Sequence, residues 1–333
     1  MTIAFFGEVM LRLSPPGREL LLQTPKLEVN VGGAEANVAT GLACLGHDVR
    51  MISAVADNPL GGAVIGELRR RGVDTGSVAI EPGRLGLYFL TPGAGLRASE
   101  VVYDRAHSVF ATRAADAWDW DAALEGVTRL HLSGITPALG ANTAEAAIAA
   151  AEAAGARGIP VSFDGNYRAK LWEAWDSDPR AVLGRLIAHA DVLFGNHRDV
   201  SLLLGKPFSG DGPDRRREAA EAAFQAFPKL RLIASTARHV DDADSHRIAA
   251  RVDTRDGAHQ TDEVLVAGIV DRIGAGDAFA AGVLHGLLEG GDARAAAEAG
   301  LALTCLKHSL PGDASLFTRA DLAAFGEGLD VRR

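Results

Sequence analysis

Short apolar runs that suit buried β-strands alternate with stretches of helical periodicity along most of this chain. The strand-like runs cover residues 3–6, 49–55, 130–132, 160–163, 192–194 and 232–234. The clearest helical stretches cover residues 34–45, 61–71, 143–154 and 214–227. Strands that alternate with helices pair in parallel and are covered by helices on both faces. We therefore expect an α/β fold with a mostly parallel central sheet, and ligand sites beyond the carboxyl ends of its strands.

Two segments interrupt this alternation, residues 11–31 and residues 85–110. In the second, the runs GLYFLTP and SEVVYDR are typical of antiparallel strands joined by a Gly-rich turn. Together the two segments could form a small separate sheet, a lid that keeps water away from a reactive phosphoanhydride. An ordinary surface hairpin would give the same local pattern. The 333 residues, 47% of them hydrophobic, suffice for a single domain that carries such an addition.

Charge and cysteine content argue against several classes of protein. The formal net charge of -9, from 43 acidic and 34 basic residues, leaves no basic stripe for a nucleic-acid backbone. Cys44 and Cys305 lie far apart without nearby ligands, which suggests neither a disulfide framework nor a zinc site and fits a reducing cytoplasm. No segment reaches the roughly 18 apolar residues of a membrane span. We expect a soluble, cytoplasmic protein with neither nucleic-acid nor membrane partners.

The segment IVDRIGAGDAFAAG at residues 269–282 carries the most distinctive chemistry. An apolar run ends here, the chain turns through Gly274, Ala275 and Gly276, and an apolar helix follows. N–H groups at such a helix start bind anions, and the small residues of the turn let a phosphate approach the backbone. Asp277 in the first helical turn would face that phosphate. A base beside a phosphate-binding turn is what phosphoryl transfer to an alcohol requires.

Three other interpretations of this segment compete. An Asp in a first helical turn is very often only a cap. A G-x-G-x-x-G dinucleotide fingerprint would need a third glycine where Phe279 stands. A Walker P-loop fails, because Lys206 is followed by Pro207 and no GxxxxGK[ST] occurs in the chain. The capping interpretation is the one that the motif by itself leaves open.

The segment DRIGAGDAFAAG resembles the C-terminal signature of the ribokinase-like (PfkB-type) carbohydrate kinases, and VGGAEANVA at residues 31–39 resembles their N-terminal signature. The motifs stand in the family's order, and the resemblance covers nearly the whole chain. It implies a ribokinase-like fold with a β-sheet lid, ATP and Mg²⁺, an anion hole at residues 274–276, and Asp277 as the catalytic base. By the same resemblance, Gly33 and Asn37 would contact the substrate, although Asn37 could also be a helix-face residue without a ligand.

Within this family the chain is most similar to the 2-keto-3-deoxygluconate kinases, through GLYFL, VVYDRAHS, HLSGITPAL and FDGNYRAKLW. A sugar acid carries a carboxylate, and guanidinium groups bind carboxylates in paired hydrogen bonds, so Arg105 and Arg168 are suited to hold it. These arginines could instead pair with neighbouring acids such as Asp104 and Asp164. By the resemblance, Asp313 in LPGD would touch the reacting end of the substrate.

Tyr88 and Tyr103 are either hydroxyl ligands of the substrate or aromatic residues of the lid core. Asn166 and Asn196 follow predicted strand ends, where the family places groups that meet the nucleotide phosphates and Mg²⁺. Both could also be turn formers.

The family often has a Lys-x-Gly-x-x-Gly element, whereas this chain reads IASTARHVDDADSH at residues 233–246. Resemblance to one branch of the family places Thr236 and Arg238 near the ATP phosphates. A surface strand with a solvated arginine would look the same.

These features predict an enzyme that uses ATP to phosphorylate a sugar-acid hydroxyl, converting 2-keto-3-deoxygluconate to its 6-phosphate. No side chain is assigned as a metal ligand. One alternative is a kinase for a neutral sugar such as fructose or ribose. Another is a non-catalytic nucleotide or sugar sensor on the same fold. Exposed edges of the lid sheet could also pair two copies of the chain into a homo-oligomer.

Overall fold

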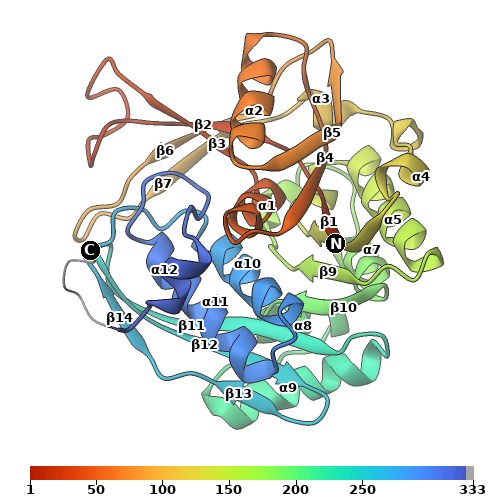
Figure 1. Ribbon diagram of the computed structural model, residues 1–333, viewed down its shortest axis with the longest axis vertical. Coiled ribbons are helices and arrows are strands. Elements are labelled where there is room, and N and C mark those ends of the chain that lie inside the picture. The colour runs from red at the N-terminus through yellow and green to blue at the C-terminus, as the bar shows by residue number, and fades with distance from the viewer. Residues whose placement is uncertain (328–333) are drawn as a thin grey trace.

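The computed structural model describes residues 1–327 and has a main sheet of ten strands in the order β13-β12-β11-β10-β9-β8-β1-β4-β5, with β14 beside β12 (Figure 1). Neighbours from β5 to β11 run parallel, and β12, β13 and β14 join antiparallel. The mostly parallel sheet is confirmed, and each predicted strand run lies within or overlaps one strand. The bounds are β1 (Thr2–Phe6), β4 (Asp48–Ala56), β5 (Val73–Glu81), β8 (Val127–Ser133), β9 (Val161–Asp164), β10 (Ala190–Phe194), β11 (Leu232–Asp242), β12 (Ser245–Thr254), β13 (Ala258–Gln260) and β14 (Val264–Ala267).

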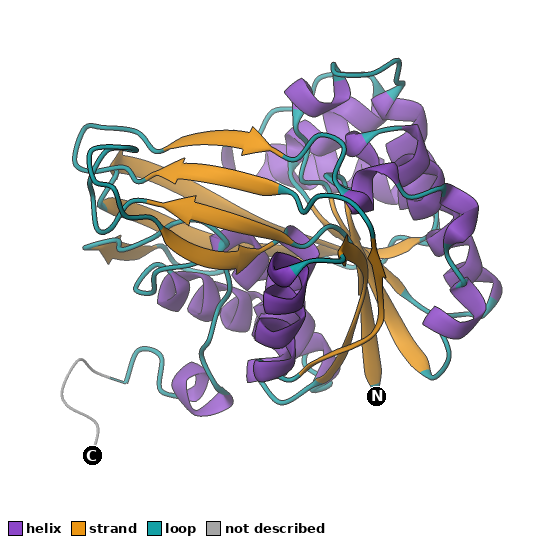
Figure 2. Ribbon diagram, turned by 90° about the horizontal axis from the view of Figure 1, so that it is seen from above, coloured by secondary structure: helices purple, strands orange, loops and turns teal. Residues whose placement is uncertain are grey.

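Helices cover both faces of this sheet, as Figures 1 and 2 show. One face carries α1 (Ala34–Cys44), α10 (Ala275–Leu288) and α11 (Ala293–Lys307). The other carries α5 (Ala141–Ala156), α7 (Pro179–Ile187), α8 (His197–Leu204) and α9 (Gly212–Ala226). The predicted helices are confirmed, with ends that shift by a few residues. The remaining elements are α2 (Pro59–Arg70), α3 (Val109–Thr112), α4 (Trp120–Ala123), α6 (Ala169–Trp172), α12 (Arg319–Ala323) and the 3₁₀ turns η1 (Ala115–Ala117) and η2 (Pro137–Leu139).

The central strands are buried on both faces, so their residues show no alternation between core and solvent. In β1, the side chains of residues 3–6 are fully buried. Continuous apolar runs of this kind are typical of parallel sheets under two helical layers. Burying a side chain the size of Phe5 stabilises the fold by about 1.5–3 kcal/mol. The runs that identified the strands in the sequence are thus also the residues that hold the layers together.

A second sheet of four strands stands beside the main one, in the order β3-β2-β6-β7 (Figure 2). Its strands are β2 (Met10–Ser14), β3 (Glu28–Gly32), β6 (Leu87–Thr91) and β7 (Glu100–Asp104). The central pair β2–β6 is parallel, and the outer pairs are antiparallel, including the predicted β6–β7 hairpin. The two segments that interrupted the helix–strand alternation therefore form one small sheet. Its role as a lid stays a prediction.

The small sheet has its own apolar contacts and also touches the main sheet. Met10, Tyr88 and Leu90 form a separate buried cluster. The N–H of Ala243, in the turn between β11 and β12, donates to the carbonyl of Gly95 in the β6–β7 loop at 2.9 Å. The projecting end of the small sheet is thereby held against the end of the β11–β12 hairpin.

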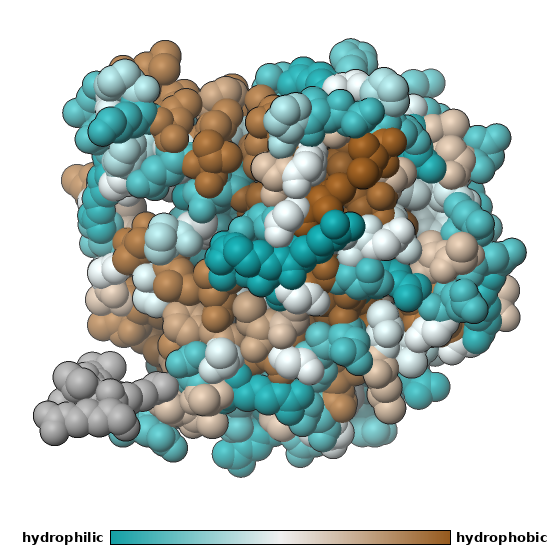
Figure 3. All heavy atoms as spheres, turned by 45° about the horizontal axis from the view of Figure 1, so that its top comes forward, coloured by the Kyte–Doolittle hydropathy of each residue, from teal (hydrophilic) through white to brown (hydrophobic). Residues whose placement is uncertain are grey.

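Apolar side chains are exposed on and around the small sheet, and Figure 3 shows apolar surface over this part of the molecule. Leu22, Val29 and Val102 are at least half exposed here. Association of two copies through this sheet stays a prediction. None of the helices within residues 1–327 combines the length and the apolar character that crossing a bilayer would need.

Helices α10 and α11 pack so closely that glycine is required where they meet. A Cβ on Gly282 would lie 2.4 Å from the carbonyl oxygen of Ala299 and 2.8 Å from the Cα of Gly300. Backbone atoms cannot move aside as a flexible side chain can. The separation of these two helices, and hence the position of α10 on the sheet, therefore depends on Gly282.

We expect Gly282→Ala to lower the free energy of unfolding by about 1–3 kcal/mol, because the two helices must separate to admit the methyl group. Gly66→Ala in α2 is the matched control, since no heavy atom lies within 4 Å of its Cβ position. That control should be neutral or stabilise the protein by about 0.5–1 kcal/mol. Urea unfolding measures both variants, and equal destabilisation of the two would contradict the close contact.

Candidate active site

Two adjoining cavities, of about 780 Å³ and 460 Å³, lie at the carboxyl end of β10. The larger one extends to the small sheet and the end of β9, and the smaller one is lined by residues of β11, β12, α8 and α9. Asn196, Thr236, Arg238 and Gly276 line both of them. The structure thus brings together all of the residues predicted from the sequence. The larger cavity is also lined by Gly33, Asn37, Tyr88, Tyr103, Arg105, Asn166, Arg168, Gly274, Asp277 and Asp313, and the smaller one by Ala275.

The turn that begins α10 lies where the two cavities meet. Gly274 is the N-cap, with φ of 76°, and a Cβ there would lie only 1.6 Å from the carbonyl oxygen of Asp313. Only glycine accepts both the left-handed conformation and that contact. The first N–H groups of a helix lack intrahelical partners, and here they border the cavities. The start of α10 is therefore suited to hold an anion.

Asp277 is the third residue of α10 and receives a hydrogen bond from the side-chain amide of Asn37, at 2.6 Å. Burial raises the pKa of Asp277 to about 7, the Asn37 hydrogen bond lowers it, and the nearby carboxylates of Asp313 and Glu35 raise it. A carboxylate with a pKa near neutrality is matched to proton transfer at physiological pH. Asn37 on α1 orients Asp277, and the role of Asp277 as a catalytic base stays a prediction.

Arg12 of β2 connects the small sheet to both loops beside the α10 turn. Its guanidinium lies 2.6 Å from Asp271 and 2.9 Å from Asp313, and all three side chains are buried. The hydroxyl of Tyr88 donates to Asp313 as well. Sequence analysis missed Arg12, because a single arginine in a strand has no motif around it.

Tyr88 is an aromatic residue of the small-sheet core, and its role as a hydroxyl ligand of the substrate stays a prediction. Its ring packs in the apolar cluster of the small sheet, and its hydroxyl is fixed to Asp313 at the cavity wall. Burial raises the pKa of Tyr88 above its ordinary value, so the hydroxyl stays a donor. Tyr103 is partly exposed, and its ring centroid lies 5.9 Å from that of Tyr88.

Arg105 pairs with Glu8, an acid that the sequence analysis did not consider. Its Nε and Nη2 donate to one carboxylate oxygen of Glu8, while Asp104 pairs with Arg84 instead. Within residues 1–327, the buried Nη1 of Arg105 has no hydrogen-bond partner. Arg105 is thus oriented by Glu8 and keeps donor capacity beside the larger cavity.

Two further carboxylates stand at the floor of the larger cavity, and neither was predicted as a functional group. Asp164 ends β9, and Asp199 lies in the first turn of α8. Burial raises the pKa of Asp164 to about 8, with further contributions from Asp277 and Asp199. Burial also raises the pKa of Asp199. Buried carboxylates held close together are suited to share a cation.

Asn196 caps α8, as its position after a strand suggested. Its side-chain oxygen accepts from the N–H of Arg198 at 2.8 Å, and Asp199 accepts from the Asn196 N–H at 2.7 Å. Asn166 has a positive φ of 35°, and its N–H donates to Asp164 at 3.0 Å. Both residues are turn or cap formers that also line the cavities.

Positive charge gathers along the rim of the cavities. Arg168, Arg198, Arg238 and Arg272 all line the larger one. Burial lowers the pKa of Arg238, and the charge of Arg272 lowers it further. Like charges held close together favour an anionic ligand between them. Arg198 and Arg272 were missed, although Arg272 lies within the DRIGAGD segment.

The smaller cavity combines this polar rim with apolar walls. Val200, Ala220, Ile233 and Ile248 line it beside His308. Most of the other lining side chains are polar or charged, so the cavity offers one apolar patch against which a flat organic ring could pack. The start of α10 borders this cavity through Ala275 and Gly276.

Comparison with known proteins agrees with this geometry. The model of the pfkB family of carbohydrate kinases matches residues 2–318. A 2-dehydro-3-deoxygalactonokinase from Haloferax volcanii is 33% identical over 328 residues, 98% of this chain and 96% of its own. A 2-dehydro-3-deoxygluconokinase from Bacillus subtilis is 28% identical over 324 residues, 96% of this chain and 94% of its own.

Among solved structures, a 2-dehydro-3-deoxygluconokinase from Thermotoga maritima superimposes with a TM-score of 0.92 at 37% identity. The superposition covers 98% of this chain and 100% of the other. The fold is ribokinase-like, as the resemblance implied. The family model spans nearly the whole sequence, and the chain belongs to the pfkB family of carbohydrate kinases.

Proposed function

We propose that this protein transfers the γ-phosphoryl group of ATP to a hydroxyl of 2-keto-3-deoxygluconate or a closely related sugar acid. The observation that carries the proposal is the position of Asp277. It stands at the anion-binding start of α10, where two cavities adjoin, with a pKa of about 7. The relatives named for 2-dehydro-3-deoxy sugar acids support the choice of substrate class.

In this mechanism, Asp277 accepts the proton of the attacking hydroxyl as its oxygen bonds to the γ-phosphorus. The bond from that phosphorus to the β,γ-bridging oxygen breaks, and ADP leaves with that oxygen. The N–H groups at the start of α10 stabilise charge on the phosphoryl oxygens as the reaction proceeds. Asn37 holds the Asp277 carboxylate in place through its amide. The protein needs no further reacting group, because phosphoryl transfer depends chiefly on the positioning of the reactants and on electrostatic stabilisation.

The nucleotide would occupy the smaller cavity. Its base fits the apolar walls, and Thr236, Arg238 and Asn166 lie where the phosphates would extend toward α10. Asp164, Asp199 and Asn196 offer the oxygen ligands that Mg²⁺ prefers, and the raised pKa values of the two acids fit a site that a cation stabilises. When bound, Mg²⁺ would neutralise charge on the β- and γ-phosphates.

The sugar acid would occupy the larger cavity, with its carboxylate near Arg168 and the free Nη1 of Arg105. Gly33 and Asn37 border the path of its hydroxyls. Closure of the small sheet would exclude water from the γ-phosphate. A neutral sugar would offer no anion to Arg168 or to the free Nη1 of Arg105. A non-catalytic sensor would not require a base poised near pH 7.

We expect Asp277→Asn to lower kcat by about two to four orders of magnitude and to leave ATP affinity nearly unchanged, because a general base acts in the transition state. Asp214→Asn is the matched control, an aspartate in the first turn of α9 that lines neither cavity. An ADP-release assay and nucleotide titration measure the two effects. Near-normal turnover of Asp277→Asn would end the proposed mechanism.

The pH dependence should follow the ionisation of Asp277. Only the carboxylate accepts a proton, so kcat/KM for the sugar acid should be constant above about pH 7 and fall about tenfold per pH unit below it. In Asn37→Ala this acidic limb should move to higher pH, because the amide that lowers the pKa of Asp277 is removed. If kcat/KM of the wild type fell only near pH 4, the raised pKa of Asp277 would be contradicted.

Substrate choice should depend on the arginines. The wild type should prefer 2-keto-3-deoxygluconate or 2-keto-3-deoxygalactonate over fructose and ribose in the same assay. Arg168→Ala should raise KM for the acid far more than KM for a neutral sugar, because a guanidinium–carboxylate pair is lost. Arg231→Ala, at an exposed position that lines neither cavity, is the control. Equal effects on both substrates would remove the carboxylate role and leave the kinase intact.

A further inference from the structure

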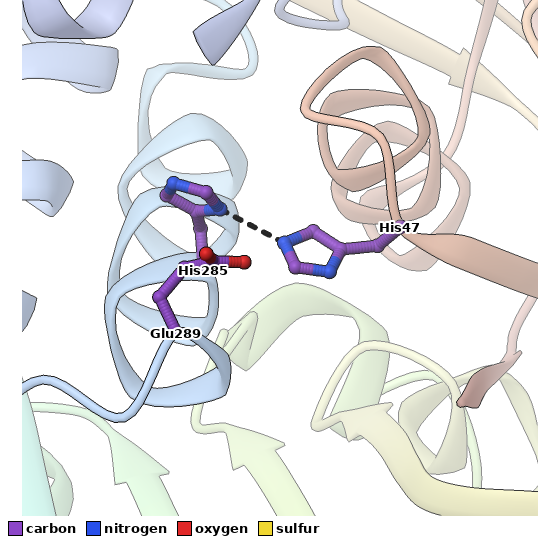
Figure 4. Close-up of side chains that lie close together, drawn as sticks. All are labelled: His47, His285 and Glu289. Carbon is purple, nitrogen blue, oxygen red and sulfur yellow. Dashed lines mark hydrogen bonds between the residues drawn. The ribbon is translucent and has the colours of Figure 1, made fainter.

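A group of metal-ligating side chains lies at the opposite end of α10 from Asp277. His47 stands between α1 and β4, and His285 and Glu289 stand in the last turn and at the C-cap of α10. Nε2 of His47 lies 2.8 Å from Nδ1 of His285, and one ligand atom from each of the three residues lies within 4.8 Å of the others. Figure 4 shows a nitrogen of each ring pointing toward the other ring, with the Glu289 carboxylate close to His285.

The arrangement has the features of a small metal site. His285 and Glu289 are four residues apart, so both project from the same face of the helix. Two imidazole nitrogens and one carboxylate are a common ligand set for Zn²⁺. A hydrogen bond between the two ring nitrogens requires one of them to accept as an unprotonated nitrogen, the form in which imidazole binds metals. Glu289 is half exposed, which leaves one side open for water.

The distances allow an ion to enter with little movement. Two nitrogens at about 2.0–2.1 Å from a tetrahedral ion are roughly 3.3 Å apart. The present separation of 2.8 Å is that of a hydrogen bond, in which one ring donates and the other accepts. The donor ring must change tautomer and the rings must part by about half an ångström. Both lone pairs then point into the space beside Glu289.

We propose that His47, His285 and Glu289 bind a divalent transition-metal ion, with Zn²⁺ as the best match, and that the ion links the end of α1 to the end of α10. Nitrogen ligands select such ions over Mg²⁺, which prefers oxygen. The site therefore differs in chemistry from the acids of the larger cavity. The proposed site contains no cysteine, and its two histidines are far apart in the sequence. The spacing of cysteines and histidines in the sequence therefore gave no indication of this site.

Arg319 competes with the ion for the carboxylate of Glu289. Its Nη2 lies 2.9 Å from Glu289, and its Nε donates to the carbonyl of Leu45 at 2.6 Å. Both charged groups of this pair are about half exposed, and exposed ion pairs contribute little to stability. A metal ion can therefore displace Arg319 from Glu289. Removal of the arginine charge should strengthen metal binding.

The proposed metal site lies at one end of the helix pair α1 and α10, and the candidate active site lies at the other end. Helices α1 and α10 cross closely, since a Cβ on Gly41 would lie 3.1 Å from the Cβ of Ala281. Asn37 and Asp277 meet at the other ends of the same helices. An ion at the far ends would restrain the helix pair from which that hydrogen bond is made. We therefore expect that binding of the ion raises the thermal stability of the protein.

The test is equilibrium dialysis of Zn²⁺ against the full chain, freed of metal and nucleotide. The wild type should bind one equivalent at this site and gain thermal stability. His47→Asn, His285→Asn and Glu289→Gln should each weaken that binding by at least about tenfold. His259→Asn on β13 is the matched control and should bind as the wild type does. Arg319→Gln should bind more tightly.

Co²⁺ absorption separates this site from metal bound by the active-site acids. Low-coordinate Co²⁺ with nitrogen ligands gives intense visible bands, and six oxygen ligands give weak ones. The bands should appear in the wild type and vanish in His285→Asn, while circular dichroism and kinase activity show that the variant is folded. Unchanged zinc stoichiometry and affinity in His47→Asn and His285→Asn would overturn the proposal, as would a wild type that binds no zinc.

Discussion

The buried ion pairs of Arg12 are the interaction on which the arrangement of the site depends. The guanidinium joins β2 to Asp271 and Asp313, the two acids that flank the α10 turn in space. The carbonyl oxygen of Asp313 in turn occupies the place where Gly274 lacks a side chain. Loss of one partner from such a network leaves a buried charge uncompensated, at a cost of about 3–5 kcal/mol. The position of the small sheet and the shape of the anion-binding turn are therefore coupled.

Crowding of carboxylates explains why the site is poised for phosphate chemistry. Asp164, Asp199, Asp277 and Asp313 all lie at or near one cavity, and burial raises the pKa of each. Their mutual repulsion is relieved by cations, which explains the arginines along the rim and fits a Mg²⁺–nucleotide ligand. Without those cations the same acids would favour protonation. This combination of charges suits the Mg²⁺–nucleotide that we propose as the ligand.

Helix α10 connects the candidate active site, the packing with α11 and the proposed metal site. Its first turn holds Asp277, its middle packs on α11 through Gly282, and its last turn brings His285 beside His47. A helix packed against backbone on one side cannot shift locally, so its two ends respond as a unit.

The sequence by itself determined the sheet, its helical cover and the place of Asp277, because apolar runs and turn glycines act through local periodicity and backbone conformation. Its motifs and family resemblance also identified part of the cavity lining, but not Asp164, Asp199, Arg198 or Arg272. Only the tertiary structure decided that Glu8, and not Asp104, orients Arg105, that Arg12 bridges two acids, and that His47 meets His285. Each of these contacts joins residues far apart in the chain, and no local pattern encodes which distant charges a fold will bury together.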